Sequence, residues 1–106
     1  MLVTTTPTLE GKTVRKYLGL VSGETILGAN IFRDIGAGLR DIFGGRARSY
    51  ERSLIEAKQS AINQMIEQAK GMGANAVIGV SLDFETVGSN GSMLMVSASG
   101  TAVIVE

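Results

Sequence analysis

The sequence contains no cysteine, no histidine and no tryptophan. The lack of cysteine and histidine excludes disulfides, thiolate nucleophiles, Ser–His and Cys–His catalysis, and the common zinc sites. The chain also has no net charge, because ten basic side chains balance ten acidic ones. Nucleic-acid-binding domains and polybasic membrane anchors usually carry an excess of positive charge. We therefore expect neither a nucleic acid nor a membrane as a partner.

Charged residues are scarce as well. They make up 19% of the chain, below the usual value of about 25%, and the 14 glycines are about twice the average share. Mean hydropathy is +0.22, which is on the apolar side for a small chain. Few charges and many small residues indicate that another copy of the chain covers part of the surface. The sequence thus predicts a homo-oligomer, the alternative being a monomer rich in glycine turns.

The length of 106 residues fits one domain, spanning 1–106. No apolar run approaches the 18 to 20 residues needed to cross a bilayer. The first residues have neither a basic region nor a long apolar stretch, so no secretory signal is indicated. We expect a cytoplasmic protein that needs no cofactor.

Hydrophobic spacing predicts two helices. The first spans 31–43 and follows Asn30, and the second begins at the N-cap Ser49 and runs to Met72. Alternating residues and turn-forming dipeptides predict strands, with turns at Ser22–Glu24 and Gly88–Gly91. The expected strands are 1–6, 13–20, 25–27, 76–87 and 92–105.

These elements predict an α+β fold of two layers, in which an antiparallel sheet has one face covered by the long helix. The helix at 31–43 carries its own apolar stripe, with residues such as Phe32, Leu39 and Ile42 at three- and four-residue spacings. A single two-layer subunit leaves this second stripe without a partner surface. This surplus is a further reason to expect an oligomer.

The segment that leads into the long helix is the best candidate for a binding site. Free backbone N–H groups at a helix start, two guanidinium groups and a hydroxyl could hold a small anion. The segment lacks the spaced glycines and the lysine of a P-loop, so it predicts no nucleotide. The alternative is an ordinary turn with a helix cap, whose arginines pair with nearby acids or a neighbouring subunit. The residues concerned are Gly44, Gly45, Arg46, Arg48 and Ser49.

Asp83 and Glu85 form a candidate acidic pair, because they share one strand face about 7 Å apart. Two carboxylates could hold calcium or magnesium weakly, or act as an acid–base pair if burial shifted one of them. A solvated strand face is the alternative, and we assign no catalytic residue. Four methionines offer thioethers, but the two in the long helix are expected to pack in the core, and the two in the last strand are expected to be exposed or to contact another subunit, so we predict no metal site. They are Met65, Met72, Met93 and Met95.

The order of the motifs resembles the YbjQ-like family. The resemblance rests on the runs 17–24, 40–46, 49–51 and 69–77, of which Gly-Gly-Arg followed by Ser-Tyr-Glu is the most specific. It implies a small dodecin-like subunit that assembles into a homopentameric ring. The family is often labelled as heavy-metal-binding and has no established catalytic residues to carry over. The sequence therefore predicts a ring-forming binding or scaffold protein of unknown ligand. The alternatives are an enzyme with its site between subunits, or a weak metal-ion binder.

Overall fold

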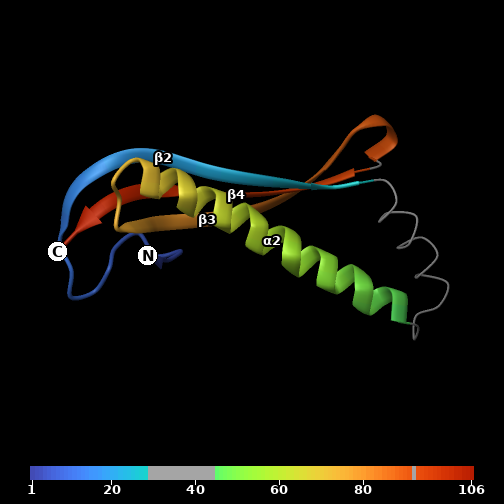
Figure 1. Ribbon diagram of the computed structural model, residues 1–106, viewed down its shortest axis with the longest axis horizontal. Helices are drawn as coiled ribbons and strands as arrows, with labels where there is room; N and C mark the ends of the chain where they lie inside the picture. The colour runs from blue at the N-terminus through green and yellow to red at the C-terminus, as the bar shows by residue number, and fades with distance from the viewer. Residues whose placement is uncertain (29–44, 92) are drawn as a thin grey trace.

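The computed structural model describes residues 1–28, 45–91 and 93–106 (Figure 1). The helix expected at 31–43 lies outside these residues. The described elements form a four-stranded sheet and one long helix, as the α+β prediction requires. In chain order they are β1 (Leu2–Val3), β2 (Val14–Leu27), α2 (Gly45–Gly71), β3 (Ala76–Val87), the short 3-10 helix η1 (Ser89–Gly91) and β4 (Met93–Val105).

The sheet has the order β1-β3-β4-β2 and is mixed. The central strand β4 pairs antiparallel with both β2 and β3, whereas β1 pairs parallel with β3. The prediction of a wholly antiparallel sheet is therefore wrong at β1. The strand expected at 1–6 pairs over two residues only, and its continuation then follows a bulge in β3. There the N–H groups of Gly79 and Val80 donate to the carbonyl oxygens of Thr6 and Thr4, at 2.8 and 3.0 Å.

Strand β2 is continuous, so the hairpin expected around Ser22–Glu24 is wrong. Gly23 lies in the middle of the strand, where the backbone of α2 passes over it. A Cβ atom on Gly23 would lie 2.0 Å from the carbonyl oxygen of Ala61 and 2.7 Å from the amide nitrogen of Met65. Glycine is needed here because the helix packs directly on the strand, and not because the chain turns.

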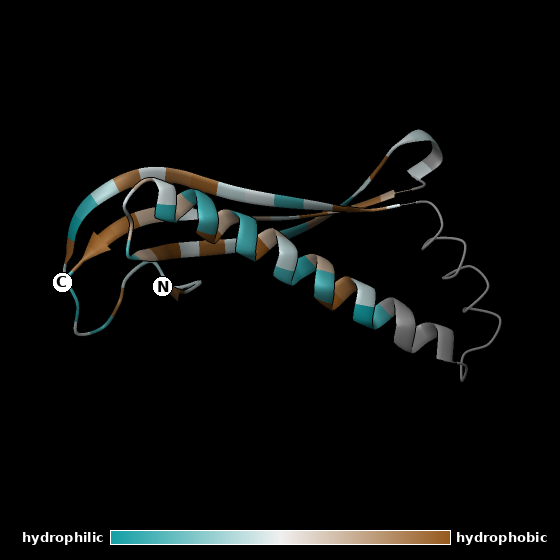
Figure 2. Ribbon diagram, in the orientation of Figure 1, coloured by the Kyte–Doolittle hydropathy of each residue, from teal (hydrophilic) through white to brown (hydrophobic). Residues whose placement is uncertain are grey.

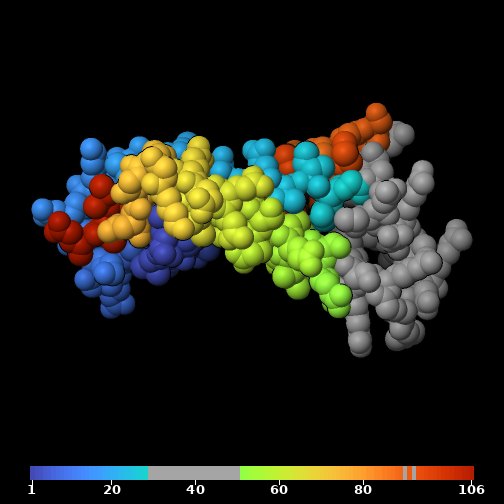
Figure 3. Space-filling view, in the orientation of Figure 1, coloured from blue at the N-terminus to red at the C-terminus, as the bar shows by residue number. Residues whose placement is uncertain are grey.

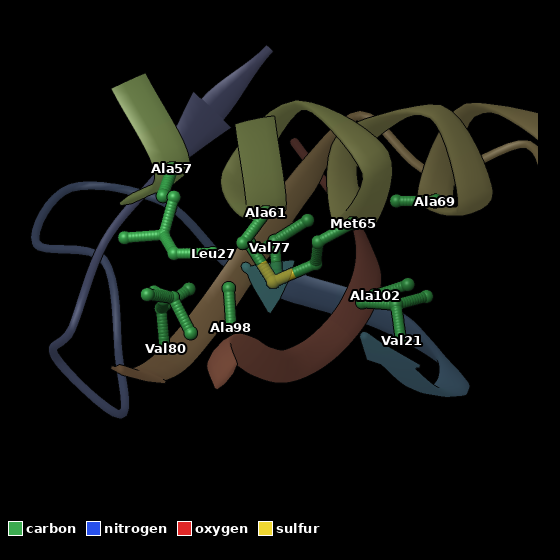
Figure 4. Packing of buried hydrophobic residues seen from close by; sticks show 11 residues of the cluster. Val21, Leu27, Ala57, Ala61, Met65, Ala69, Val77, Val80, Ala98 and Ala102 are labelled. Atoms are coloured by element: carbon green, nitrogen blue, oxygen red, sulfur yellow. The ribbon is translucent and has the colours of Figure 1, made fainter. Parts of the chain in front are cut away.

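The long helix α2 begins at Gly45, earlier than predicted, so Ser49 lies within the helix and is not its N-cap. The long helix covers one face of the sheet, as predicted, with an apolar stripe in which every fourth residue from Ala57 onward is buried. Its central member, Met65, points from the helix toward Val77 and Ala98 on the sheet (Figure 4). The buried residues of the stripe are Ala57, Ala61, Met65 and Ala69.

Near the start of β3 and the end of β4, the sheet buries apolar side chains on both of its faces. Under α2, Val21, Val96 and Ala98 join the main core. A second cluster, built on Ile78 and Val103, is packed by the segment that precedes β2. Figure 2 shows these hydrophobic stretches along the strands, while α2 is largely hydrophilic outside its buried stripe.

The described elements form an elongated body. Its radius of gyration is 16.8 Å, compared with about 13 Å for a compact domain of this length. Helix α2 crosses the sheet obliquely, and its N-terminal end lies away from the strands (Figure 1), while Ser53 and Glu56 already line a hollow together with Thr25 and Leu27 of β2. The space-filling view shows the same elongated body (Figure 3). Ile55 is 61% exposed, whereas its neighbour Leu54 packs against the main core. The elongated shape leaves part of the sheet uncovered.

Candidate functional site

Beyond the short strand β1, the outer strands of the sheet are β2 and β3. Neighbouring groups cover the outer backbone edges of these two strands to different extents. On β2, side chains of α2 reach the outer backbone groups. The N–H of Ser22 donates to Oε1 of Gln68 at 2.7 Å, and the N–H of Glu24 donates to Oε1 of Gln64 at 3.1 Å. Unpaired N–H groups on an edge strand are a template for pairing with another chain. The two glutamines occupy that template in the middle of β2.

The edge of β3 is occupied only near its start. Residues 2–6 pair with Ala76, Val77 and the bulge that follows them, and no described strand continues beyond. The N–H of Val80 points to this outer edge, since it donates to the carbonyl oxygen of Thr4. Along an antiparallel strand, successive residues direct their N–H groups alternately to the two neighbouring edges. The N–H groups of Leu82, Phe84 and Thr86 therefore face the open edge.

Each strand has a seven-residue stretch of open edge. We call residues 14–20 the β2 open edge and residues 81–87 the β3 open edge. In the β2 open edge, Tyr17 is 68% and Leu20 is 79% exposed, and in the β3 open edge Leu82 is 38% and Phe84 is 49% exposed. Large apolar side chains on an unpaired strand indicate an interaction surface.

The charges of the two open edges differ in sign. The β2 open edge carries Arg15 and Lys16 and no acid, whereas the β3 open edge carries Asp83 and Glu85 and no base. Arg15 also pairs with Glu106 through Nε and Oε2 at 3.4 Å, and both side chains are largely exposed. The two edges thus combine similar apolar content with opposite charge.

Asp83 and Glu85 are both exposed, as expected for a solvated strand face. Across the strand, Asp83 is opposite Ser97 and Glu85 is opposite Met95. Within the described residues, no three acidic, histidine or cysteine side chains gather in a way that could hold a metal ion. The pair therefore has the surroundings of a surface, without the burial that acid–base chemistry would need.

The candidate anion-binding segment can be placed only in part. Gly44 lies outside the described residues. Gly45 is the first residue of α2, and Arg46, Arg48 and Ser49 follow within its first turns, where the structure describes the backbone alone. The segment thus does lead into a helix, and the anion remains a prediction.

The prediction of packing is confirmed for Met65 and wrong for Met72. Met65 is completely buried in the core, and Met72 is 38% exposed just beyond the end of α2. Met93 and Met95 are half-buried on β4, on the face that points away from the helix. No helix among the described residues is long and apolar enough to cross a membrane.

A shallow hollow follows the exposed side of α2. It is open to solvent, and its walls are two carboxylates and four uncharged polar side chains of the helix itself. No converging group from the sheet lines it, so it adds no catalytic constellation. The lining residues are Glu56, Gln59, Ser60, Asn63, Gln64 and Glu67.

The family model for YbjQ-like proteins, described as "putative heavy-metal-binding", matches residues 1–106, and the chain belongs to this family. A similar solved structure is that of a protein with unknown function of the DUF74 family from Pediococcus pentosaceus ATCC 25745. It shares 22% sequence identity, and the alignment covers 100% of this chain and 98% of that chain with a TM-score of 0.59. This likeness supports the fold.

Sequence reasoning missed the two open edges. The alternation in 76–87 correctly placed Leu82 and Phe84 on one face and Asp83 and Glu85 on the other. It could not show that β3 is paired on its outer side for only a few residues. A usable signal was the length of the expected strands, because the twelve residues at 76–87 exceed what a six-residue strand at 1–6 can pair.

Proposed function

We propose that this protein is a non-enzymatic subunit of a homo-oligomeric ring, which acts as a binding or scaffold protein in the cytoplasm. The observation that carries the proposal is the set of large apolar side chains exposed on the sheet of an elongated subunit. Burying such side chains against a second copy stabilises an assembly by about 25 cal/mol for each Å² removed from water. The pentameric number and the dodecin-like subunit come from the family resemblance.

The exposure of the one acidic pair that the sequence offered for acid–base chemistry favours this function over an enzyme. Asp83 and Glu85 are the only acidic pair on one strand face of the described sheet, and both are exposed. A small anion held by the segment that includes Arg46, Arg48 and Ser49 is the proposed ligand.

Light scattering on a size-exclusion column tests the assembly. A pentamer has a mass of about 55 kDa, five times the 11.1 kDa of one chain. A mass near 11.1 kDa at micromolar concentration would show that the chain is a monomer and that the ring is wrong. Native mass spectrometry of protein purified without added ligand then reports the stoichiometry and any retained anion together.

The family description suggests metal binding, which the composition does not favour. Soft metals prefer thiolate and borderline metals prefer imidazole or thiolate, and the chain contains neither. Titration of zinc, cadmium or copper(II) is expected to give no saturable binding tighter than micromolar. A stoichiometric, tighter isotherm that is lost when Met93 or Met95 is replaced would support the metal-binding alternative.

A further inference from the structure

We propose that the β3 open edge of one subunit pairs with the β2 open edge of the next, so that the sheet continues from copy to copy. This inference rests on the proposed ring and names the surfaces that form it. The occupant of each edge is a second copy of this chain. The edges lie on opposite sides of the same sheet, at the two ends of the strand order β3-β4-β2.

Backbone hydrogen bonding supports pairing at these places. Gln64 and Gln68 occupy the outer N–H groups in the middle of β2, and residues 2–6 occupy the start of the β3 edge. The longest stretches left unpaired by described neighbours are 14–20 and 81–87, and the last three residues of β2, 25–27, also have no described strand beside them. Seven residues exceed the typical strand length of five to six residues. In the β2 open edge, two bulges, between Val14 and Lys16 and between Tyr17 and Gly19, divide this length into shorter paired stretches.

The charges on the two open edges favour pairing of β2 with β3 over pairing of identical edges. If two β3 open edges paired antiparallel about Phe84, Asp83 of each copy would lie opposite Glu85 of the other. Like charges directly opposite each other destabilise a strand pair. Two β2 open edges would likewise bring Arg15 and Lys16 together with their copies. Pairing β2 with β3 brings bases to acids, and this favours the mixed combination.

The mixed combination explains why the assembly would be a ring. An interface between two different surfaces is head-to-tail, and it produces a closed ring when the rotation closes. A pairing of identical edges would stop at a dimer. The exposed side chains of Tyr17, Leu20, Leu82 and Phe84 would all lie at the junctions and lose solvent contact there.

Crosslinking tests the mixed pairing directly, because the chain has no cysteine of its own. The variants are Tyr17→Cys, Glu85→Cys and the double variant, each treated with a bismaleimide that spans about 10 Å, roughly two strand spacings. Within one chain, Glu85 of β3 and Ile26 of β2 both lie opposite Met95 of β4, and Ile26 is nine residues beyond Tyr17. That separation is about 30 Å along the strands, too far for the reagent.

The double variant is expected to give a ladder of covalent species up to the full ring, while each single variant stays at the mass of one chain. Covalent dimers from either single variant would show pairing of identical edges and overturn the inference. An oligomer by light scattering that yields no ladder would also overturn it, while leaving the proposed ring intact. If the wild-type chain is a monomer, both the proposed ring and the pairing of β2 with β3 are wrong.

A proline tests the backbone contribution. Thr86→Pro removes an N–H that faces the open edge, and edge strands tolerate proline. Thr86→Val is the matched control, because it keeps the N–H and the branched shape. We expect Thr86→Pro to elute at 11.1 kDa with an unchanged circular dichroism spectrum, and Thr86→Val to remain assembled. Assembly of folded Thr86→Pro at wild-type concentration would contradict the role of the β3 edge. If Thr86→Pro does not fold, the crosslinking result decides alone.

Discussion

Strands β2 and β3 are both outermost along much of their length, yet their backbones are protected in opposite ways. In the middle of β2, two glutamines of α2 accept the N–H groups of Ser22 and Glu24, and Gly23 lets the helix lie directly on the strand. The second half of β3 has no such cover among the described residues. Helix α2 thus closes the middle of the β2 edge, whereas the described residues leave the second half of the β3 edge open to a partner.

The close approach at Gly23 is the feature on which the closed edge depends most. Gly23→Val would force a side chain into the backbone of α2, where Ala61 and Met65 are too close for a Cβ atom. We expect a loss of more than about 3 kcal/mol in unfolding free energy, or no folded protein at all. Urea denaturation at one fixed protein concentration measures it.

Gly28→Val is the control for that change, because no atom of the described residues lies within 4 Å of a Cβ built at Gly28. We expect it to unfold near the wild-type midpoint. A Gly23→Val protein as stable as this control would mean that α2 does not rest on β2 as described.

The glutamines give the next largest effect. Replacing Gln64 and Gln68 together by leucine leaves the N–H groups of Ser22 and Glu24 without their side-chain acceptors. A hydrogen bond contributes about 1 kcal/mol net, so we expect a loss of about 2 kcal/mol. Opening this edge should also promote concentration-dependent association beyond the wild-type mass. Chemical denaturation and light scattering check the two outcomes, and an unchanged variant would show that the glutamines do not protect the edge.

Phe84→Thr on the open edge should have a smaller effect on the isolated fold. The ring of Phe84 is already 49% exposed, so only part of its burial is lost, which corresponds to about 1 kcal/mol. The loss should grow with protein concentration, because a residue at an interface adds stability only when the partner is bound. Val96→Thr, in the core, is expected to cost the same at every concentration. Equal concentration dependence for both would argue against Phe84 as an interface residue.

The sequence predicted the regular part of the fold well. Periodicity located the buried stripe of α2, and alternation gave the bounds of β3 and nearly those of β4. It failed at Gly23, because a glycine needed for close packing and a glycine needed for a turn look the same along the chain. The helix residue that presses on Gly23, Ala61, is far away in sequence. Local patterns do not record such contacts.

The candidate site shows the same limit. Alternation predicted that Asp83 and Glu85 share one strand face, and the structure shows that both residues are exposed. The pattern could not tell which strand would be outermost, because strand order depends on pairings between distant segments. Parallel pairing of β1 with β3 likewise needs contacts across most of the chain. The open edges therefore became visible only when the strands were placed side by side.

The smallest expected effect comes from a glutamine on the same helix that touches no strand. Nε2 of Gln59 donates to Oδ1 of Asn63 at 2.9 Å, on the exposed side of α2. Such pairs one turn apart stabilise a helix by about 0.2–0.5 kcal/mol, so Gln59→Leu should cost less than about 0.5 kcal/mol. The single variants Gln64→Leu and Gln68→Leu should each cost about twice as much or more, although the substitution is identical. Denaturation of the three variants under identical conditions measures how much more a glutamine adds to the unfolding free energy when it accepts a hydrogen bond from the β2 edge. Equal losses for all three would mean that the bonds to Ser22 and Glu24 contribute no more than a surface contact, and that the two edges of the sheet do not differ in protection.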